Sequence, residues 1–145
     1  MTMKNRLFLA LVALLFAVAP SLRAQENWAD VEPIAQSIVR MKSLSRCVVE
    51  AIERQVTERG IAGADGREEI AIQTALSLER AICCLERRFF DGADQEEVEE
   101  RLRLVEALAK RVQGSAGRFV LYNTTREKLA ALLNEKDWLK SKLGM

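Results

Sequence analysis

The spacing of apolar residues is the feature that most constrains the fold of this chain. Between residues 67 and 90 apolar side chains recur at steps of four, three, four, three and four residues, and a similar rhythm returns over 95–113. Such steps place side chains within one narrow arc of an α-helix. The first stripe is Ala71, Ala75, Leu78, Ile82, Leu85 and Phe89, and the second is Val98, Leu102, Val105, Ala109 and Val112. No stretch alternates long enough to predict a sheet, so the expected fold class is all-α.

The first helix is predicted over residues 31–59. Pro33 falls in its first turn, where a missing N–H costs no hydrogen bond, and Gly60 follows its last turn. Its apolar stripe consists of Ile34, Ile38, Met41, Val48 and Ile52.

Two pairs of acidic residues predict the starts of the second and third helices. Asp65 with Glu68, and Asp94 with Glu97, have the spacing at which an aspartate accepts a hydrogen bond from a free backbone N–H of the first turn. The helices are therefore expected over residues 67–90 and 95–113. Gly114 is expected to end the third helix.

The last helix is predicted over residues 125–143. Residues 114–117, with the sequence Gly-Ser-Ala-Gly, are expected to form a flexible connection before it, and the apolar run 119–122 is too brief to classify by period. Thr124 and Glu127 form a third pair with capping spacing. One side of this helix carries Leu129, Leu132, Leu133, Leu139 and Leu143.

Short connections between helices of this length favour antiparallel neighbours, so residues 25–145 are expected to form a single up-down-up-down four-helix bundle. A two-chain coiled coil is the alternative. A coiled coil buries two apolar positions of each heptad, and the apolar arcs of the predicted helices are wider than that, because they include further residues. These are Ile72, Leu76, Leu104 and Leu108.

Residues 1–24 have the composition of a secretory signal peptide. Lys4 and Arg6 precede an apolar run over 7–19, and small residues follow it. The run is too short to cross a bilayer as a helix, at about 20 Å against roughly 30 Å. We expect cleavage after Ala24, no stable membrane span in the mature form, and a secreted or periplasmic location.

The charge of the mature chain does not indicate nucleic-acid binding. Removal of Lys4, Arg6 and Arg23 from 22 basic residues, against 21 acidic ones, leaves a net charge of about −2. A near-neutral chain without a basic stripe is not expected to bind a polyanion.

Three cysteines gain importance from the expected export, because an oxidising compartment permits disulfides. Cys83 and Cys84 are adjacent on a predicted helix, where their Cα atoms are too close, and their side chains too divergent, for a bond between them. Counting from the connection between the first two helices brings Cys47 within about one turn of both. We therefore expect a Cys47–Cys83 disulfide and a free thiol at Cys84.

Cys84 is also a candidate reactive thiol. Arg80, Arg87 and Arg88 lie three or four residues from it, and neighbouring cations favour a thiolate. An ordinary small residue on a helix flank is the simpler interpretation, because the chain has no C-x-x-C motif. The sequence leaves open a homodimer, including one linked through Cys84.

No combination of residues indicates catalysis. The chain contains no histidine, which is the commonest general base and metal ligand. It also lacks a Gly-rich phosphate loop, a nucleophile elbow and a metalloprotease motif. Three cysteines without histidine fall short of the four ligands of a structural zinc site. We expect no enzyme, no metal and no cofactor.

Four aromatic residues are candidate anchors for a partner protein: Trp138, Trp28, Phe119 and Tyr122. Trp138 would project away from the leucines of a continuous last helix, where an exposed tryptophan can anchor a partner. A break at Asn134, with Asp137 starting a new turn, would instead turn the indole inward.

The expected function is protein–protein binding through a face of the exported bundle, as in an inhibitor, immunity factor, adaptor or chaperone. An alternative is a helical module that encloses a small molecule or lipid in its interior or beneath residues 119–122. A further alternative is a thiol redox or metal-responsive protein that uses Cys84.

Overall fold

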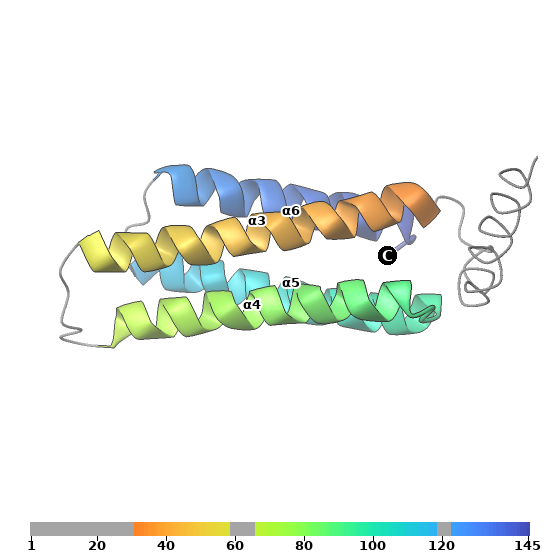
Figure 1. The fold of residues 1–145 in the computed structure, drawn as a ribbon, viewed down its shortest axis with the longest axis horizontal. Helices are drawn as coiled ribbons and strands as arrows, with labels where there is room; N and C mark the ends of the chain where they lie inside the picture. The colour runs from red at the N-terminus through yellow and green to blue at the C-terminus, as the bar shows by residue number, and fades with distance from the viewer. Residues whose placement is uncertain (1–30, 59–65, 119–122) are drawn as a thin grey trace, which may run out of the picture.

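The computed structural model of the protein describes residues 31–58, 66–118 and 123–145. These residues form four α-helices: α3 (Val31–Glu58), α4 (Arg67–Phe90), α5 (Gln95–Arg118) and α6 (Asn123–Lys142). α3 packs against both α4 and α6, and α4 packs against α5, an arrangement consistent with an up-down bundle (Figure 1). The all-α prediction is confirmed. The expected leader, Trp28, Phe119 and Tyr122 lie outside the described residues.

The core forms where the apolar stripes predicted it. Every member of the stripes of α3, α4 and α5 is buried, as are Leu129, Leu132, Leu139 and Leu143 of α6, while Leu133 is half-buried. Such burial is the main driving force for a bundle of amphipathic helices, because helices of this length gain most of their stability from packing. Among the described helices, none has the length and apolarity that a membrane span requires.

The turn between α4 and α5 follows the predicted chemistry. Gly92 has a φ of 87°, and the N–H of Ala93 donates to the carbonyl of Arg88 at 2.9 Å, which closes α4 with a left-handed cap. Asp94 then accepts the N–H of Glu97 at 2.9 Å, which confirms its capping role. The carboxylate of Glu97 binds Arg88 of α4 instead of reaching back to the cap.

α4 begins at residue 67, as expected. Its N-cap is Gly66, with a φ of 69°, a left-handed geometry that a glycine tolerates. The predicted capping residue, Asp65, lies outside the described residues. Among the described residues, the Glu68 carboxylate keeps one buried oxygen without a hydrogen-bond partner.

The prediction that Gly114 ends the third helix is wrong, because α5 continues to Arg118. Each glycine costs a helix about 1 kcal/mol relative to alanine. That cost is tolerated here because adding residues to an existing helix needs no new nucleation. A Cβ at Gly114 would meet nothing within 4 Å, so neither close packing nor a turn requires a glycine at this position.

α6 begins at Asn123, before the predicted cap at Thr124, and runs without a break through Asn134. The alternative in which Asp137 starts a new turn is therefore wrong. Trp138 projects to the flank of a continuous helix, as the first interpretation required, but its side chain is half-buried against the core.

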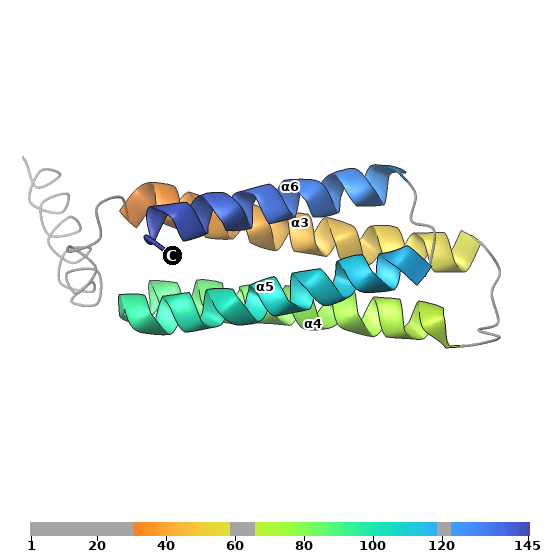
Figure 2. The ribbon, with the colours of Figure 1, turned by 180° about the vertical axis from the view of Figure 1, so that it is seen from behind.

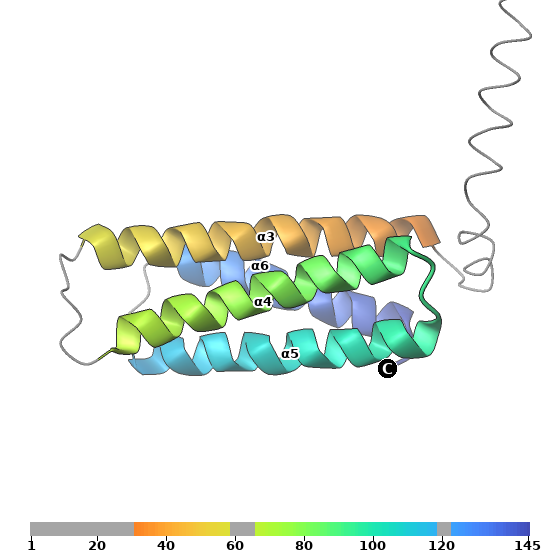
Figure 3. The ribbon, with the colours of Figure 1, turned by 60° about the horizontal axis from the view of Figure 1, so that its bottom comes forward.

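The seams between helices are unequal. α5 and α6 lie at the rear of the first view and come forward in the reverse view (Figure 2), and they touch each other far less than the other three neighbouring pairs do. Polar side chains bridge this seam, including Gln95 Nε2, which donates to the Leu143 carbonyl at 3.1 Å. A view turned about the horizontal axis shows α3, α4 and α5 lengthwise in front, with α6 behind them (Figure 3).

Candidate functional site

Trp138 is the one predicted aromatic anchor within the described residues. Its indole packs partly against the core, and Lys142 Nζ lies 5.6 Å from the ring centroid. An ammonium at this distance is attracted by the ring face. Trp138 therefore contacts the core and Lys142 of its own helix, and only part of its surface is open to a partner.

The three cysteines lie on three different sides of the helices. Cys47 follows Arg40 by seven residues and shares the side of α3 that faces α6, whereas Cys83 lies near Lys42 on the side where α3 meets α4. Cys84 faces α5. All three thiols are free, so the structure does not form the expected Cys47–Cys83 disulfide. Helical spacing gives a reason, because it places Cys47 with Arg40 on the side toward α6, away from Cys83 at the contact of α3 with α4.

Cys84 contacts a cation that sequence reasoning did not identify. Arg101 Nη1 of α5 donates to Cys84 Sγ at 3.2 Å, and Arg88 lies nearby and is held by Glu97. The sequence predicted three arginines of α4 near this thiol. Arg101 adds a fourth from α5, and the spacing of residues within α4 could not reveal it. The sulfur is half-buried in this contact.

A shallow groove runs along the outer side of the α4–α5 seam, which we call the α4–α5 groove. It is a depression of about 340 Å³ that is open to solvent. Thr74 and Ser77 of α4 line it and donate their hydroxyls to carbonyls of their own helix, so these side chains add little bulk. The lining residues are Gly66, Glu69, Ile70, Gln73, Thr74, Ser77, Leu108 and Arg111.

One exposed apolar side chain lines the α4–α5 groove, and another lies one helical turn beyond it. Ile70 of α4 is 59% exposed, the highest value among the large apolar residues described, and Leu104 of α5 is 49% exposed. Leu104 lies one helical turn before Leu108, on the same side of α5. The groove therefore presents apolar surface on both of its walls, with the exposed guanidinium of Arg111 beside it.

A second depression, of about 440 Å³, lies where α3 begins and α4 ends. Val39 and Phe90 are each 48% exposed there, and Ala35 completes the apolar surface. Glu32, Gln36 and Arg40 form its polar rim.

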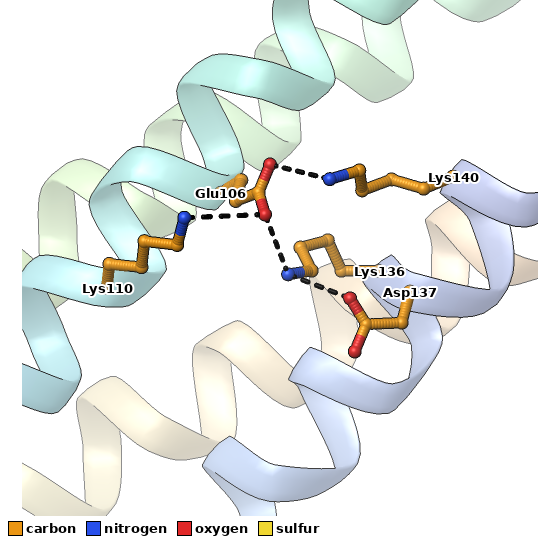
Figure 4. Close-up of polar contacts among 5 residues, drawn as sticks. All are labelled: Glu106, Lys110, Lys136, Asp137 and Lys140. Atoms are coloured by element: carbon orange, nitrogen blue, oxygen red, sulfur yellow. Dashed lines mark hydrogen bonds and ion pairs between the residues drawn. The ribbon is translucent and has the colours of Figure 1, made fainter. Parts of the chain in front are cut away.

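The most buried charged cluster bridges α5 and α6 (Figure 4). The Glu106 carboxylate forms ion pairs with Lys140 Nζ at 2.9 Å, Lys136 Nζ at 3.4 Å and Lys110 Nζ at 3.6 Å. Lys136 Nζ also lies 2.9 Å from Asp137 Oδ1. The hydrogen bond from Lys140, together with Lys136, outweighs burial and lowers the pKa of Glu106 to about 2. Glu106 therefore stays ionised near neutral pH and holds Lys136 and Lys140 of α6 across the seam.

Lys136 was missed by sequence reasoning. Its side chain is only 7% exposed and takes the place in the α6 stripe between Leu132 and Leu139. Burial acts to lower the pKa of Lys136, but Asp137 and Glu106 raise it above its ordinary value. The signal was present in the spacing, because residue 136 lies four residues after Leu132 and three before Leu139.

A second carboxylate joins α6 to α3. Glu135 accepts the hydroxyl of the fully buried Ser37 at 2.9 Å and the Nε–H of Arg40 at 2.7 Å. Burial works against this charge, but Arg40 and Ser37 lower the pKa of Glu135 below its ordinary value. α6 is thus held to both of its neighbours by carboxylate contacts.

Within the described parts of the chain, no group of three or more histidine, cysteine or acidic side chains is placed to hold a metal ion. Comparison of the chain with protein families, curated proteins and solved structures finds no match. Among the large apolar side chains of the described residues, the most exposed is Ile70, which lines the α4–α5 groove.

Proposed function

We propose that this protein is exported and binds another protein through the α4–α5 groove. The observation that carries the proposal is the apolar surface of this depression, Ile70 on α4 and Leu108 on α5, with the exposed Leu104 one helical turn farther along α5. Apolar surface left open in a bundle with a well-buried core commonly marks a binding site.

The shape of the groove favours an amphipathic helix as its occupant. Two helices with small side chains between them allow a third helix to approach, with its apolar residues spaced three and four apart in contact with the depression. The depression is open to solvent and does not enclose a volume, which suits a partner's side chains better than a small molecule.

Arg111 adds a charge preference. Its guanidinium is exposed beside the groove and forms no ion pair with any described residue, so a carboxylate on the partner helix would be complementary to it. The proposed partner segment therefore combines an apolar stripe with an acidic residue.

Export is supported by the sequence of the first 24 residues, which has the charge and apolar run of a cleaved leader. N-terminal sequencing of protein recovered from the native host tests this part. The proposal predicts a mature chain that begins at Gln25, and a chain that begins at Met1 or Thr2 would contradict it.

Substitution within the groove tests the binding proposal. Ile70→Asp and Leu104→Asp should each weaken capture of a partner from the native compartment by about tenfold or more, because a charge would enter an apolar contact. Ala130→Asp, at an exposed position on α6, is the matched control and should leave capture unchanged. Equal capture by the groove variants and the control would contradict the proposal.

A further inference from the structure

The depression of about 440 Å³ lies where α3 begins and α4 ends, and Figure 3 shows these two helix ends at the same end of the bundle. Val39 of α3 and Phe90 of α4 are each 48% exposed there. The buried Phe89 packs edge-to-face against Phe90, with 5.5 Å between the ring centroids. This contact orients the Phe90 ring while half of it stays open to solvent. An apolar group that covered this surface would therefore be stabilised by its burial.

The chain enters the bundle at this same end. α3 begins at Val31, and Trp28 lies three residues before it, outside the described residues. Three residues span at most about 10 Å. The depression extends from Glu32 to Val39, and Val39 lies about 12 Å along the helix from Val31. The backbone and side chain of Trp28 together are therefore long enough to reach the depression.

The same tether places the α4–α5 groove out of reach of Trp28. Ser77, the residue of that groove nearest in sequence to Phe90, precedes it by 13 residues, or about 20 Å along α4. Trp28 is thus restricted to the end of the bundle that holds the depression. Its attachment to α3 gives the indole a high effective concentration there.

Pro33 favours a change of direction just before α3. Proline has no N–H to donate to the carbonyl four residues earlier, and in a continued helix its ring would clash with that carbonyl. Pro33 fits the first turn of α3, because the N–H groups of a first turn have no partner within the helix. A chain that leaves the helical path before Val31 can turn back along α3, toward Ala35 and Val39.

The segment before α3 contains one large apolar side chain. Residues 25–30 have the sequence Gln-Glu-Asn-Trp-Ala-Asp, in which Trp28 is flanked by polar and small residues. An indole combines a wide apolar ring with a single N–H donor, which needs an acceptor when the ring is buried. Trp28 is therefore the residue of this segment that gains most from an apolar site with an acceptor at its edge.

The depression offers both kinds of contact. Ala35, Val39 and Phe90 supply the apolar surface. Glu32 and Gln36 lie at the rim, where both residues are exposed, and Gln36 Nε2 donates to Glu32 Oε1 at 3.3 Å. The second oxygen of the Glu32 carboxylate can accept the N–H of an indole.

We propose that Trp28 turns back along α3 and docks its indole in this depression, over Val39 and Phe90. Residues 25–30 then form a strap that covers the junction of α3 and α4 at the start of the mature chain. The strap buries the apolar surface of this end and leaves the α4–α5 groove open for a partner.

Fluorescence of Trp28 tests the proposal on the mature chain, residues 25–145, carrying Trp138→Phe so that Trp28 is its single tryptophan. Docking should shift the emission to shorter wavelength than in the urea-unfolded chain. It should also lower quenching by acrylamide about threefold or more, because a docked ring meets less solvent. Phe90→Ala and Val39→Asp should each restore the emission and quenching of an exposed indole. Leu104→Ala, which truncates a side chain that is 49% exposed on α5, is the matched control and should change neither.

An indole that is quenched as readily in the folded chain as in the unfolded one would overturn the proposal. So would protection that survives both Phe90→Ala and Val39→Asp, since Trp28 would then dock elsewhere. Protection that is lost on dilution would also overturn it, because a second copy of the chain would then supply the contact. Phe90→Ala should leave capture of a partner through the α4–α5 groove intact, so this inference and the proposed function can fail separately.

Discussion

Lys136 Nζ of α6 lies 3.4 Å from Glu106 Oε1 of α5, and the lysine occupies a buried position of the α6 stripe where its neighbours are leucines. Burial of an ammonium is costly unless it is paired. Here one ion pair with Glu106 and another with Asp137 offset that cost. Because α5 and α6 contact each other less than the other neighbouring helices do, we interpret this pair as the contact that fixes how the two helices meet.

Removing the two partners should have unequal effects. Glu106→Gln leaves Lys136 buried with less compensation and should lower the free energy of unfolding by about 2 kcal/mol. Lys136→Met should change it by less than about 1 kcal/mol, because Met fills similar volume and Glu106 keeps Lys140. Urea denaturation measures both values. Equal losses for the two variants would show that the buried ammonium does not depend on Glu106.

The same carboxylate predicts a pH dependence. The pKa of Glu106 is lowered from 4.5 to about 2, chiefly by the hydrogen bond from Lys140, so its contribution to stability is complete above 4.5 and is lost as the pH falls toward 2. The native chain should exceed Glu106→Gln in stability by about 2 kcal/mol near neutral pH after allowance for solvent screening, and by progressively less below pH 4.5. Denaturation curves at a series of pH values measure the difference. A difference that stays constant with pH would contradict this origin.

Ser37 and Glu135 should be energetically coupled. Glu135→Ala leaves the buried Ser37 hydroxyl without its acceptor, and Ser37→Ala removes one of the donors to Glu135. Each variant should lose about 1 to 2 kcal/mol, and the double variant should lose less than the sum. A double-mutant cycle measures the coupling, and strict additivity would argue against a direct contact.

The state of the cysteines can be measured directly. The structure has three free thiols. It predicts reaction of all three with a thiol reagent after unfolding without reductant, and an intact mass that reductant leaves unchanged. Reaction of a single thiol, with a gain of two hydrogens on reduction, would instead support the Cys47–Cys83 bridge expected from the sequence.

Much of the fold could be predicted because each apolar stripe contains enough members to define a period. The six-residue stripe of α4 predicted both the helix and the side that it buries, and all six side chains are buried. Helix ends were less certain. Gly114 carries the usual stop signal, yet nothing in the local sequence tells whether the preceding helix is stable enough to continue through it.

The candidate site was harder to predict, because it depends on which sides of two helices meet. Lys136 was not singled out, because a lysine is expected at the surface until Glu106 is known to lie opposite. Arg101 reaches Cys84 from a different helix, which spacing within α4 cannot show. The α4–α5 groove likewise joins Ile70 to Leu108, which are far apart in sequence.

Site-specific photo-crosslinking in the native compartment tests the central claim, that the α4–α5 groove binds a protein partner. A photoreactive residue at position 104 should give one crosslinked partner, and Ile70→Asp in the same chain should abolish that product. The same residue at position 130 of α6, which is exposed on another side, should give no such product. Equal crosslinking at both positions, or none at position 104, would contradict the account.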